Sequence, residues 1–156
     1  MGNDAWEMGM TTNAYLKRFE ELAQRRGLSL GGMHSASPAD FALMLAAAAQ
    51  RFVPAHAYTE REVNERLRTW LAGVGAMLVV DHVELRRWLV DTGVLTRDGF
   101  GRAYTLGAPS PAIFAAMAAM AGHDLDAIVR VVRERNAAHR EARKLQWAQR
   151  QAADHD

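Results

Sequence analysis

The sequence predicts a mainly α-helical fold in which three helices lead into a β-hairpin. Three times, a residue that can cap a helix is followed three positions later by an acidic residue. These pairs are Ser37 with Asp40, Thr59 with Glu62, and Asp81 with Glu84. The capping side chain can accept a hydrogen bond from a free N–H of the first turn, and the acid favours the helix dipole. An Asp-Gly pair after the third helix is typical of a hairpin turn.

The first of these helices is expected over about residues 38–53. Pro38 suits the first helical position, and Pro54 ends the helix because proline cannot continue the hydrogen-bond pattern. The segment is rich in alanine, and its bulky residues include Phe41, Leu45 and Phe52.

The second and third helices are expected over about 60–71 and 82–92, from apolar residues at helical spacing. These residues are Val63, Leu67, Trp70 and Leu71 in one helix and Leu85, Trp88 and Leu89 in the other. Glycines after residue 71 break the second helix, and residues 77–80 could form a short extended piece. Gly93 is a suitable residue to end the third helix.

A hairpin follows, with strands expected at 94–97 and 102–106 and a turn at Asp98-Gly99. The flanks are predicted to be helical. An amphipathic helix over 12–26, with Tyr15, Phe19 and Leu22 inward, ends at Gly27 and is followed by a linker. After Pro109 a helix of small residues runs to Gly122, and a long last helix starts near residue 123 and continues to about residue 150.

Helix, helix, helix, hairpin is the order of a winged helix–turn–helix. We therefore expect an N-terminal tail, helix and linker over 1–37, the winged domain over 38–106, and a helical extension over 107–156. The second half of the last helix has only a thin apolar seam, made of Ala138, Ala142, Leu145 and Ala152. Such a helix is poorly stable alone in water, so we expect a homodimer through the C-terminal helices.

The composition excludes several classes of function. The absence of cysteine rules out disulfides, thiolate metal sites and a cysteine nucleophile, and it is consistent with a reducing cytoplasm. No apolar run approaches the roughly 20 residues of a membrane span, and the N-terminus does not resemble a secretory signal. The histidines form no metal-binding pair, and residues 123–126, "HDLD", suit helix caps better than metal ligands. We therefore expect a cytoplasmic protein that is not an enzyme and has no cofactor, metal or membrane partner.

Net charge gives no support for nucleic-acid binding. The formal charge of the chain is +1, and residues 58–106 contain seven basic and seven acidic groups. The placement of individual residues carries the hypothesis instead, because the third helix of a winged helix–turn–helix lies in the DNA major groove and the hairpin contacts phosphates. The predicted DNA-binding residues are Arg61, Asn64, Arg68, His82, Arg86, Arg87, Arg97 and Arg102.

Each of these residues also has an ordinary structural interpretation. Arg87 lies three residues after Glu84 and four before Asp91, so it could form only helix-surface ion pairs. The hairpin could be a plain edge hairpin, although Phe100 is unusual in a fully solvated turn. Residues 130–150 have a local excess of five positive charges, which could serve a solvated helix or a DNA contact.

The residues between 58 and 104 and their spacing resemble a bacterial family catalogued as domain of unknown function 2087. The matching residues are Tyr58 to Asn64, Asp81, Leu85-Arg86-Arg87, Leu89-Val90-Asp91, Gly93, Val94-Leu95, Arg97-Asp98 and Gly101-Arg102-Ala103-Tyr104. The resemblance covers about residues 41–106 and implies a bacterial source. It also implies an association with transcriptional regulators, in some of which the domain follows a helix–turn–helix domain. The chain departs from the family pattern at Thr105, where a basic residue is usual.

The sequence therefore predicts a dimeric bacterial transcriptional regulator that reads duplex DNA through its third helix and hairpin. The alternative is a winged-helix module that binds a protein partner and no DNA. The charge balance of residues 58–106 favours the alternative, whereas the arginines of the third helix and the hairpin favour DNA.

Overall fold

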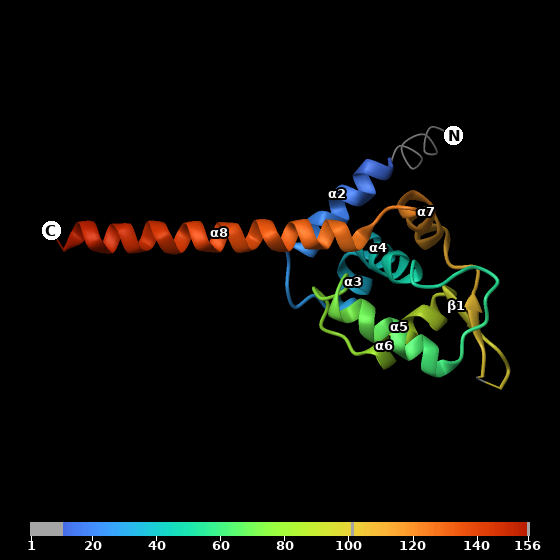
Figure 1. The fold of residues 1–156 in the computed structure, drawn as a ribbon. Helices are drawn as coiled ribbons and strands as arrows, with labels where there is room; N and C mark the ends of the chain where they lie inside the picture. The colour runs from blue at the N-terminus through green and yellow to red at the C-terminus, as the bar shows by residue number, and fades with distance from the viewer. Residues whose placement is uncertain (1–10, 101, 156) are drawn as a thin grey trace.

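The computed structural model describes residues 11–100 and 102–155, and it is mainly helical with one small antiparallel hairpin (Figure 1). The helices are α2 (Thr12–Ala23), α3 (Leu30–Ala36), α4 (Pro38–Ala49), α5 (Glu60–Ala72), α6 (His82–Asp91), α7 (Pro111–Met120) and α8 (Leu125–Asp154). The strands are β1 (Leu95–Arg97) and β2 (Tyr104–Leu106). The predicted order of three helices and a hairpin is confirmed for the segment from α4 to β2.

Helix α4 lies at the centre of the fold, and every residue from Asp40 to Ala49 is buried. Its alanines allow neighbouring helices to approach closely, and α2, α3 and α7 all pack against it. At its end, the Gln50 side-chain amide donates a hydrogen bond of 2.7 Å to the carbonyl of Met120. This bond ties the last turn of α4 to the end of α7.

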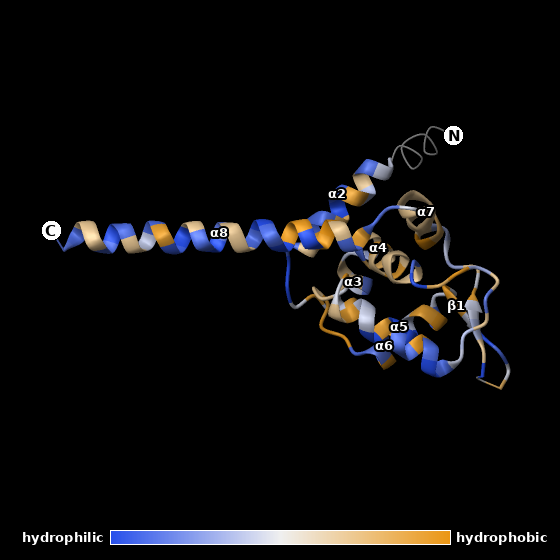
Figure 2. Cartoon of the chain, in the orientation of Figure 1, coloured by the Kyte–Doolittle hydropathy of each residue, from blue (hydrophilic) through white to orange (hydrophobic). Residues whose placement is uncertain are grey.

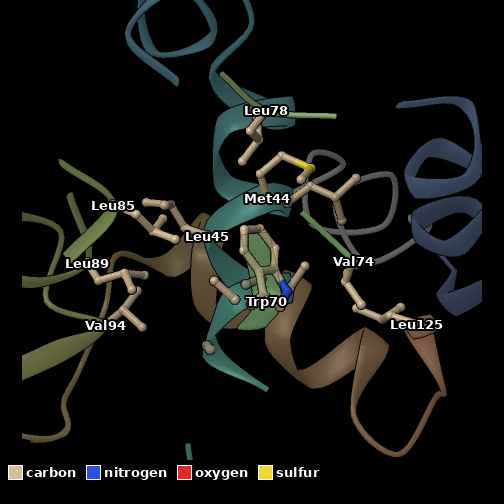
Figure 3. Packing of buried hydrophobic residues seen from close by; sticks show 14 of the residues in the cluster. Met44, Leu45, Trp70, Val74, Leu78, Leu85, Leu89, Val94 and Leu125 are labelled. Carbon is tan, nitrogen blue, oxygen red and sulfur yellow. The ribbon is translucent and has the colours of Figure 1, made fainter. Parts of the chain in front are cut away.

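The core is organised around the fully buried Trp70 of α5 (Figure 3). Met44 and Leu45 of α4 lie beside the indole, and the buried residues of α6 continue the same cluster. Gly75 is required here, because a Cβ at this position would overlap the six-membered ring of Trp70. The packing therefore joins α4, α5 and α6 into one unit.

Two of the three predicted capping pairs are confirmed. Thr59 and Glu62 form a reciprocal capping box, with both hydrogen bonds at 3.1 Å. The Asp81 carboxylate accepts a 2.8 Å hydrogen bond from the backbone N–H of Glu84. The Ser37 prediction is wrong in detail: Ser37 stands at the cap of α4, but its side chain makes no capping bond. Residue 37 also ends the preceding helix α3, so its backbone must serve both helices.

Asp40 does not act in capping, because its carboxylate binds an arginine from α2. The Nε and Nη2 of Arg18 donate hydrogen bonds to the two carboxylate oxygens at 2.8 and 2.7 Å. A two-point contact of this kind is among the stronger ion-pair geometries in proteins. The acid that the sequence assigns to a helix start therefore connects two helices.

The predicted linker over residues 28–37 is also wrong, since it contains helix α3. The Ser29 hydroxyl caps this helix by accepting from the N–H of Gly32 at 3.1 Å, and Leu30 and Met33 are buried. Two glycines weaken the intrinsic helix propensity, but burial of the apolar residues overrides it. Helices α2 and α4 end three and four residues earlier than predicted.

The hairpin pairs Leu95 with Leu106 and Arg97 with Tyr104. The connection spans residues 98–103 and is longer than the predicted two-residue Asp-Gly turn. The backbone N–H of Asp98 donates a hydrogen bond to the carbonyl of Ala103 at 2.9 Å. The Asp98 carboxylate accepts a hydrogen bond from the backbone N–H of Arg102 at 2.7 Å. Asp98 thus closes a wider loop than a tight turn would form. The predicted extended piece at 77–80 is reduced to one parallel bridge between Leu28 and Leu78.

Helix α8 packs on the body only at its beginning and then extends away from it (Figures 1 and 2). Its buried residues are Leu125, Val129 and Val132. The last contacts are a hydrogen bond of 2.9 Å from Arg133 to the carbonyl of Gly73 and an ion pair of 2.9 Å between Arg135 and Glu20. Residues 137–155 are all exposed. The predicted long last helix is confirmed.

Among the described residues, no single helix is both long enough and apolar enough to cross a membrane. The pair α7 and α8, which is bent by 78°, passes such a test by length and composition only.

Candidate functional site

Helix α6 and the hairpin border a hollow of about 290 Å³. Its lining residues are Val83, Arg86, Arg87, Val90, Asp91, Arg97 and Tyr104. We call it the α6–hairpin hollow. Three of the eight predicted DNA-binding residues, Arg86, Arg87 and Arg97, meet here although they come from two different elements.

Arg86 is held in place by partners on α5. Its guanidinium donates a hydrogen bond to the side-chain carbonyl of Asn64 and lies 3.4 Å from a carboxylate oxygen of Glu60. The same Glu60 oxygen accepts a 3.3 Å hydrogen bond from the hydroxyl of the buried Tyr104. The Arg86 side chain is only 19% exposed. The main role of Arg86 is therefore to join α5, α6 and, through Glu60, β2. These contacts leave little of its guanidinium available to a ligand.

Glu60 and Tyr104 were absent from the predicted site residues, although they orient Arg86. Glu60 and Asn64 are four residues apart on α5, so their shared face could be inferred from helical spacing. The sequence does not show that this face meets Arg86, because that contact depends on how α5 packs against α6.

Arg87 and Arg97 are both exposed, and neither forms an ion pair with a described residue. The ion pairs considered for Arg87, with Glu84 or Asp91, are not present among the residues that the structure describes. Asp91 does line the same hollow and lowers its positive potential. Two guanidinium groups, each with five N–H donors, are thus available at one concave surface.

The remaining predicted residues lie outside the hollow. Arg61 is 89% exposed and pairs with Glu65 at 3.4 Å on the surface of α5. Arg68 lies 3.3 Å from the Nε2 of His82, at the start of α6. Arg102 belongs to the hairpin loop, where its guanidinium lies 5.4 Å from the ring centre of Phe100. The structure therefore separates the predicted site into the hollow, an α5 surface and a hairpin tip.

The hairpin tip is notable because Phe100 is 82% exposed. A large exposed aromatic side chain beside an arginine provides an apolar and cationic contact surface. Phe100 does not line the α6–hairpin hollow, so any partner that touches both must extend along the hairpin.

The lining of the hollow suits anion binding more than acid–base chemistry. Guanidinium groups favour planar or tetrahedral oxyanions, such as carboxylates and phosphates. Among the described residues of the lining, Asp91 is the only acid, and no histidine, serine or lysine accompanies it. Within the described ranges, no group of three or more histidine or acidic side chains is arranged to hold a metal ion.

Two perturbed acidic groups lie away from the hollow and have structural causes. The hydrogen bonds from Arg18 hold the pKa of Asp40 below its ordinary value. The pKa of Glu62 is lowered by the hydrogen bond that its carboxylate accepts from the backbone N–H of Thr59. Asp124, considered above as part of "HDLD", caps α8 by accepting from Ala127 at 3.0 Å, and Asp126 pairs with Arg51 at 3.1 Å.

No curated protein and no solved structure matches this chain. A match to a family model covers the end of α3 and all elements from α4 to β2, and so includes every residue of the α6–hairpin hollow. It confirms the resemblance noted from the sequence and starts six residues earlier than expected. Residues 35–106 match the family described as "Uncharacterized protein conserved in bacteria (DUF2087)".

Proposed function

We propose that the segment from α4 to β2 is a winged helix–turn–helix and that it binds duplex DNA as part of a bacterial transcriptional regulator. The order of its elements supports this fold. So does Tyr58, which exchanges two 2.8 Å backbone hydrogen bonds with Tyr104 and thereby adds a third strand position to the hairpin. A short strand between the first two helices that joins the hairpin is typical of winged-helix domains.

The observation that carries the proposal is the pair Arg87 and Arg97 at the α6–hairpin hollow. In this fold α6 would enter the major groove and the hairpin would lie over the flanking backbone. Arg87 would then reach a guanine edge or a phosphate, and Arg97 a phosphate beside it. Arg86 would support this arrangement by fixing α6 against α5, in place of the base contact expected from the sequence.

The charge balance constrains how tightly such a surface can bind. Residues 58–106 contain seven basic and seven acidic groups. Of the acidic groups, Asp91 lines the α6–hairpin hollow and Glu60 pairs with Arg86 of its lining. Non-specific affinity should therefore be low and its dependence on salt shallow, because few phosphates can be neutralised.

A titration of fluorescent duplex DNA at several salt concentrations tests the proposal, using wild type and the Arg87→Gln/Arg97→Gln double variant. The slope of log affinity against log salt should fall by about 0.9 for each lost phosphate contact. If Arg87 instead reads a guanine, its loss should cost about 1–3 kcal/mol on the preferred sequence and little elsewhere. Both side chains are exposed and unpaired, so the variant should remain folded.

The matched control is Lys17→Gln/Arg25→Gln, which removes the same charge from the exposed surface near α2. It should leave affinity and salt slope unchanged at matched ionic strength. No duplex binding by the folded wild type at low salt would rule the proposal out. So would a double variant that binds as well as wild type.

The alternative is a protein partner on the same surface, and the exposed Phe100 favours it. An aromatic residue beside an arginine is a common arrangement in protein interfaces. If duplex DNA does not bind, this surface is better tested by cross-linking from position 100 in cells.

We also propose that α8 mediates self-association. Val131 and Leu145 are 48% and 62% exposed, and they fall on the same side of the helix as Ala138 and Ala142. A second copy packed on this side would cover the seam and stabilise a helix that otherwise lacks tertiary contacts beyond residue 136.

A further inference from the structure

The outer part of α8, residues 137–154, has its four arginine and lysine side chains on one side of the helix. At 100° per residue, seven side chains fall within an arc of about 120°, namely Arg140, Arg143, Lys144, Trp147, Arg150, Gln151 and Asp154. We call the four cations and Trp147 of this arc the cationic face of α8. Ala138, Ala142 and Leu145 lie on the opposite side, with Glu141 beside them. All of these residues are exposed.

The acidic residues near this face neutralise little of it. Lys144 forms an ion pair of 3.6 Å with Glu141, but both side chains are more than 70% exposed. Exposed pairs of this kind contribute little. Asp154 lies on the same side one turn after Arg150, and the described residues show no ion pair between them. Arg140, Arg143 and Arg150 therefore have no acidic partner within the described chain.

This arrangement does not stabilise the helix itself. Arg140 and Lys144 are four residues apart, and Arg140 and Arg143 are three apart, so like charges are neighbours on the surface. Each such pair destabilises a helix slightly. The Trp147 side chain is 64% exposed and makes no ring contact with a described aromatic residue. A bound polyanion would relieve the repulsion and give the indole a surface to pack on.

We propose that the cationic face of α8 binds single-stranded nucleic acid, with the basic side chains on phosphates and Trp147 stacked on a base. An aromatic ring among cations is the usual recognition surface for single strands, because every unpaired base offers a stacking face. Duplex DNA would satisfy the charges but offers no unpaired base to Trp147. This site is separate from the α6–hairpin hollow and does not depend on duplex binding there.

An anionic membrane fits the geometry less well. A helix lying on a membrane inserts its large apolar residues on one side and keeps its cations on the other. Here Trp147 lies among the cations, and Leu145 is about 160° away around the helix, so no single orientation inserts both.

The test is fluorescence anisotropy of the full chain with a labelled 15-nucleotide oligo-dT at several salt concentrations. Three variants are compared with wild type: Trp147→Leu, Arg140→Gln/Arg143→Gln and Arg140→Lys/Arg143→Lys. Removing the indole should weaken binding by about 5- to 150-fold through lost stacking. Removing two cations should reduce the salt slope by about 1.4, at about 0.7 per phosphate on a single strand. The lysine variant keeps both charges and should retain most of the binding.

Leucine and glutamine are good helix formers, so these variants should keep the helical circular-dichroism signal of wild type. Lys17→Gln/Arg25→Gln is the control for net charge and should bind the oligonucleotide as wild type does. Arg87→Gln/Arg97→Gln should also bind it normally, which separates this site from the duplex proposal.

Three results would overturn the inference. The first is unchanged oligo-dT binding by either the Trp147→Leu variant or the glutamine variant. The second is binding of heparin or a 15-base-pair duplex as tightly as oligo-dT with no effect of Trp147→Leu, which would show attraction by charge alone. The third is binding to phosphatidylserine vesicles, with a blue shift of tryptophan fluorescence, by a protein that does not bind the oligonucleotide.

Discussion

Helices α4 and α8 represent two extremes of how a helix is stabilised in this protein. In α4, ten of twelve residues are buried, whereas in α8 only three of thirty are. Helix α4 has one charged residue, Asp40, and the outer part of α8 alternates charged residues with alanine and glutamine. Tertiary packing therefore holds α4, and intrinsic helix propensity must hold most of α8.

The same substitution in the two helices should have very different effects. Leu45 is fully buried beside Trp70, and Leu145 is 62% exposed. Leu45→Ala should lower the free energy of unfolding by about 2–5 kcal/mol, because it removes apolar contacts and leaves a cavity. Leu145→Ala should change it by no more than about 0.5 kcal/mol in a monomer.

Urea unfolding followed by circular dichroism measures both variants under the same conditions. If Leu145→Ala destabilises as much as Leu45→Ala at low protein concentration, α8 has partners inside one copy that this structure does not show. If the loss for Leu145→Ala grows with protein concentration, the residue is buried by a second copy.

A smaller effect is expected at the contact that anchors α4 to α2. Asp40→Asn removes the charged acceptor of the two Arg18 hydrogen bonds, and Arg18 keeps its 2.9 Å contact with Glu21. The loss should be about 1–3 kcal/mol at neutral pH, since hydrogen bonds to charged groups lie in that range.

The difference in stability between wild type and Asp40→Asn should depend on pH, because Arg18 lowers the pKa of Asp40 from its ordinary value of 3.8. The stabilisation is complete above the pKa of the unfolded chain and is lost as pH falls through the lower pKa of the folded chain. Wild type and Asp40→Asn should therefore differ in urea midpoint at pH 7 and approach each other as the pH falls below 3.8. A difference in midpoint that does not decrease in acid would show that the effect comes from the amide itself and not from the lost charge.

The smallest effect on the body of the protein should come from removing the outer part of α8. A chain ending at residue 136 keeps the buried Leu125, Val129 and Val132, and also the contacts of Arg133 and Arg135. The body should unfold within about 0.5 kcal/mol of the full chain when both are monomeric.

Sedimentation of the two chains at micromolar concentration tests self-association in the same experiment. The full chain should sediment as a dimer and the truncated chain as a monomer. A full chain that remains monomeric with α8 still helical would contradict the proposed role of the Val131 and Leu145 side of the helix.

Local signals in the sequence determined much of this fold. The capping pairs at Thr59 and Asp81 start α5 and α6 as expected, because a cap and its acid act within one turn. Gly93 adopts a φ of +84° after α6, which glycine tolerates best, and it marks the end of that helix as predicted. The long α8 was also visible from sequence, since it depends on propensity more than on neighbours.

Only the tertiary structure decided which of these residues meet. Residues 30–36 are helical because Leu30 and Met33 enter a core made by distant segments, despite two glycines. The Asp40 side chain binds Arg18 of α2 instead of capping its own helix. The Arg86 side chain binds Glu60 and Asn64 instead of being free for DNA as expected. A charged side chain near the core requires an opposite charge or a hydrogen-bond partner. The identity of that partner depends on the packing of helices far apart in sequence, so helical spacing predicts which side chains share a face but not what that face contacts.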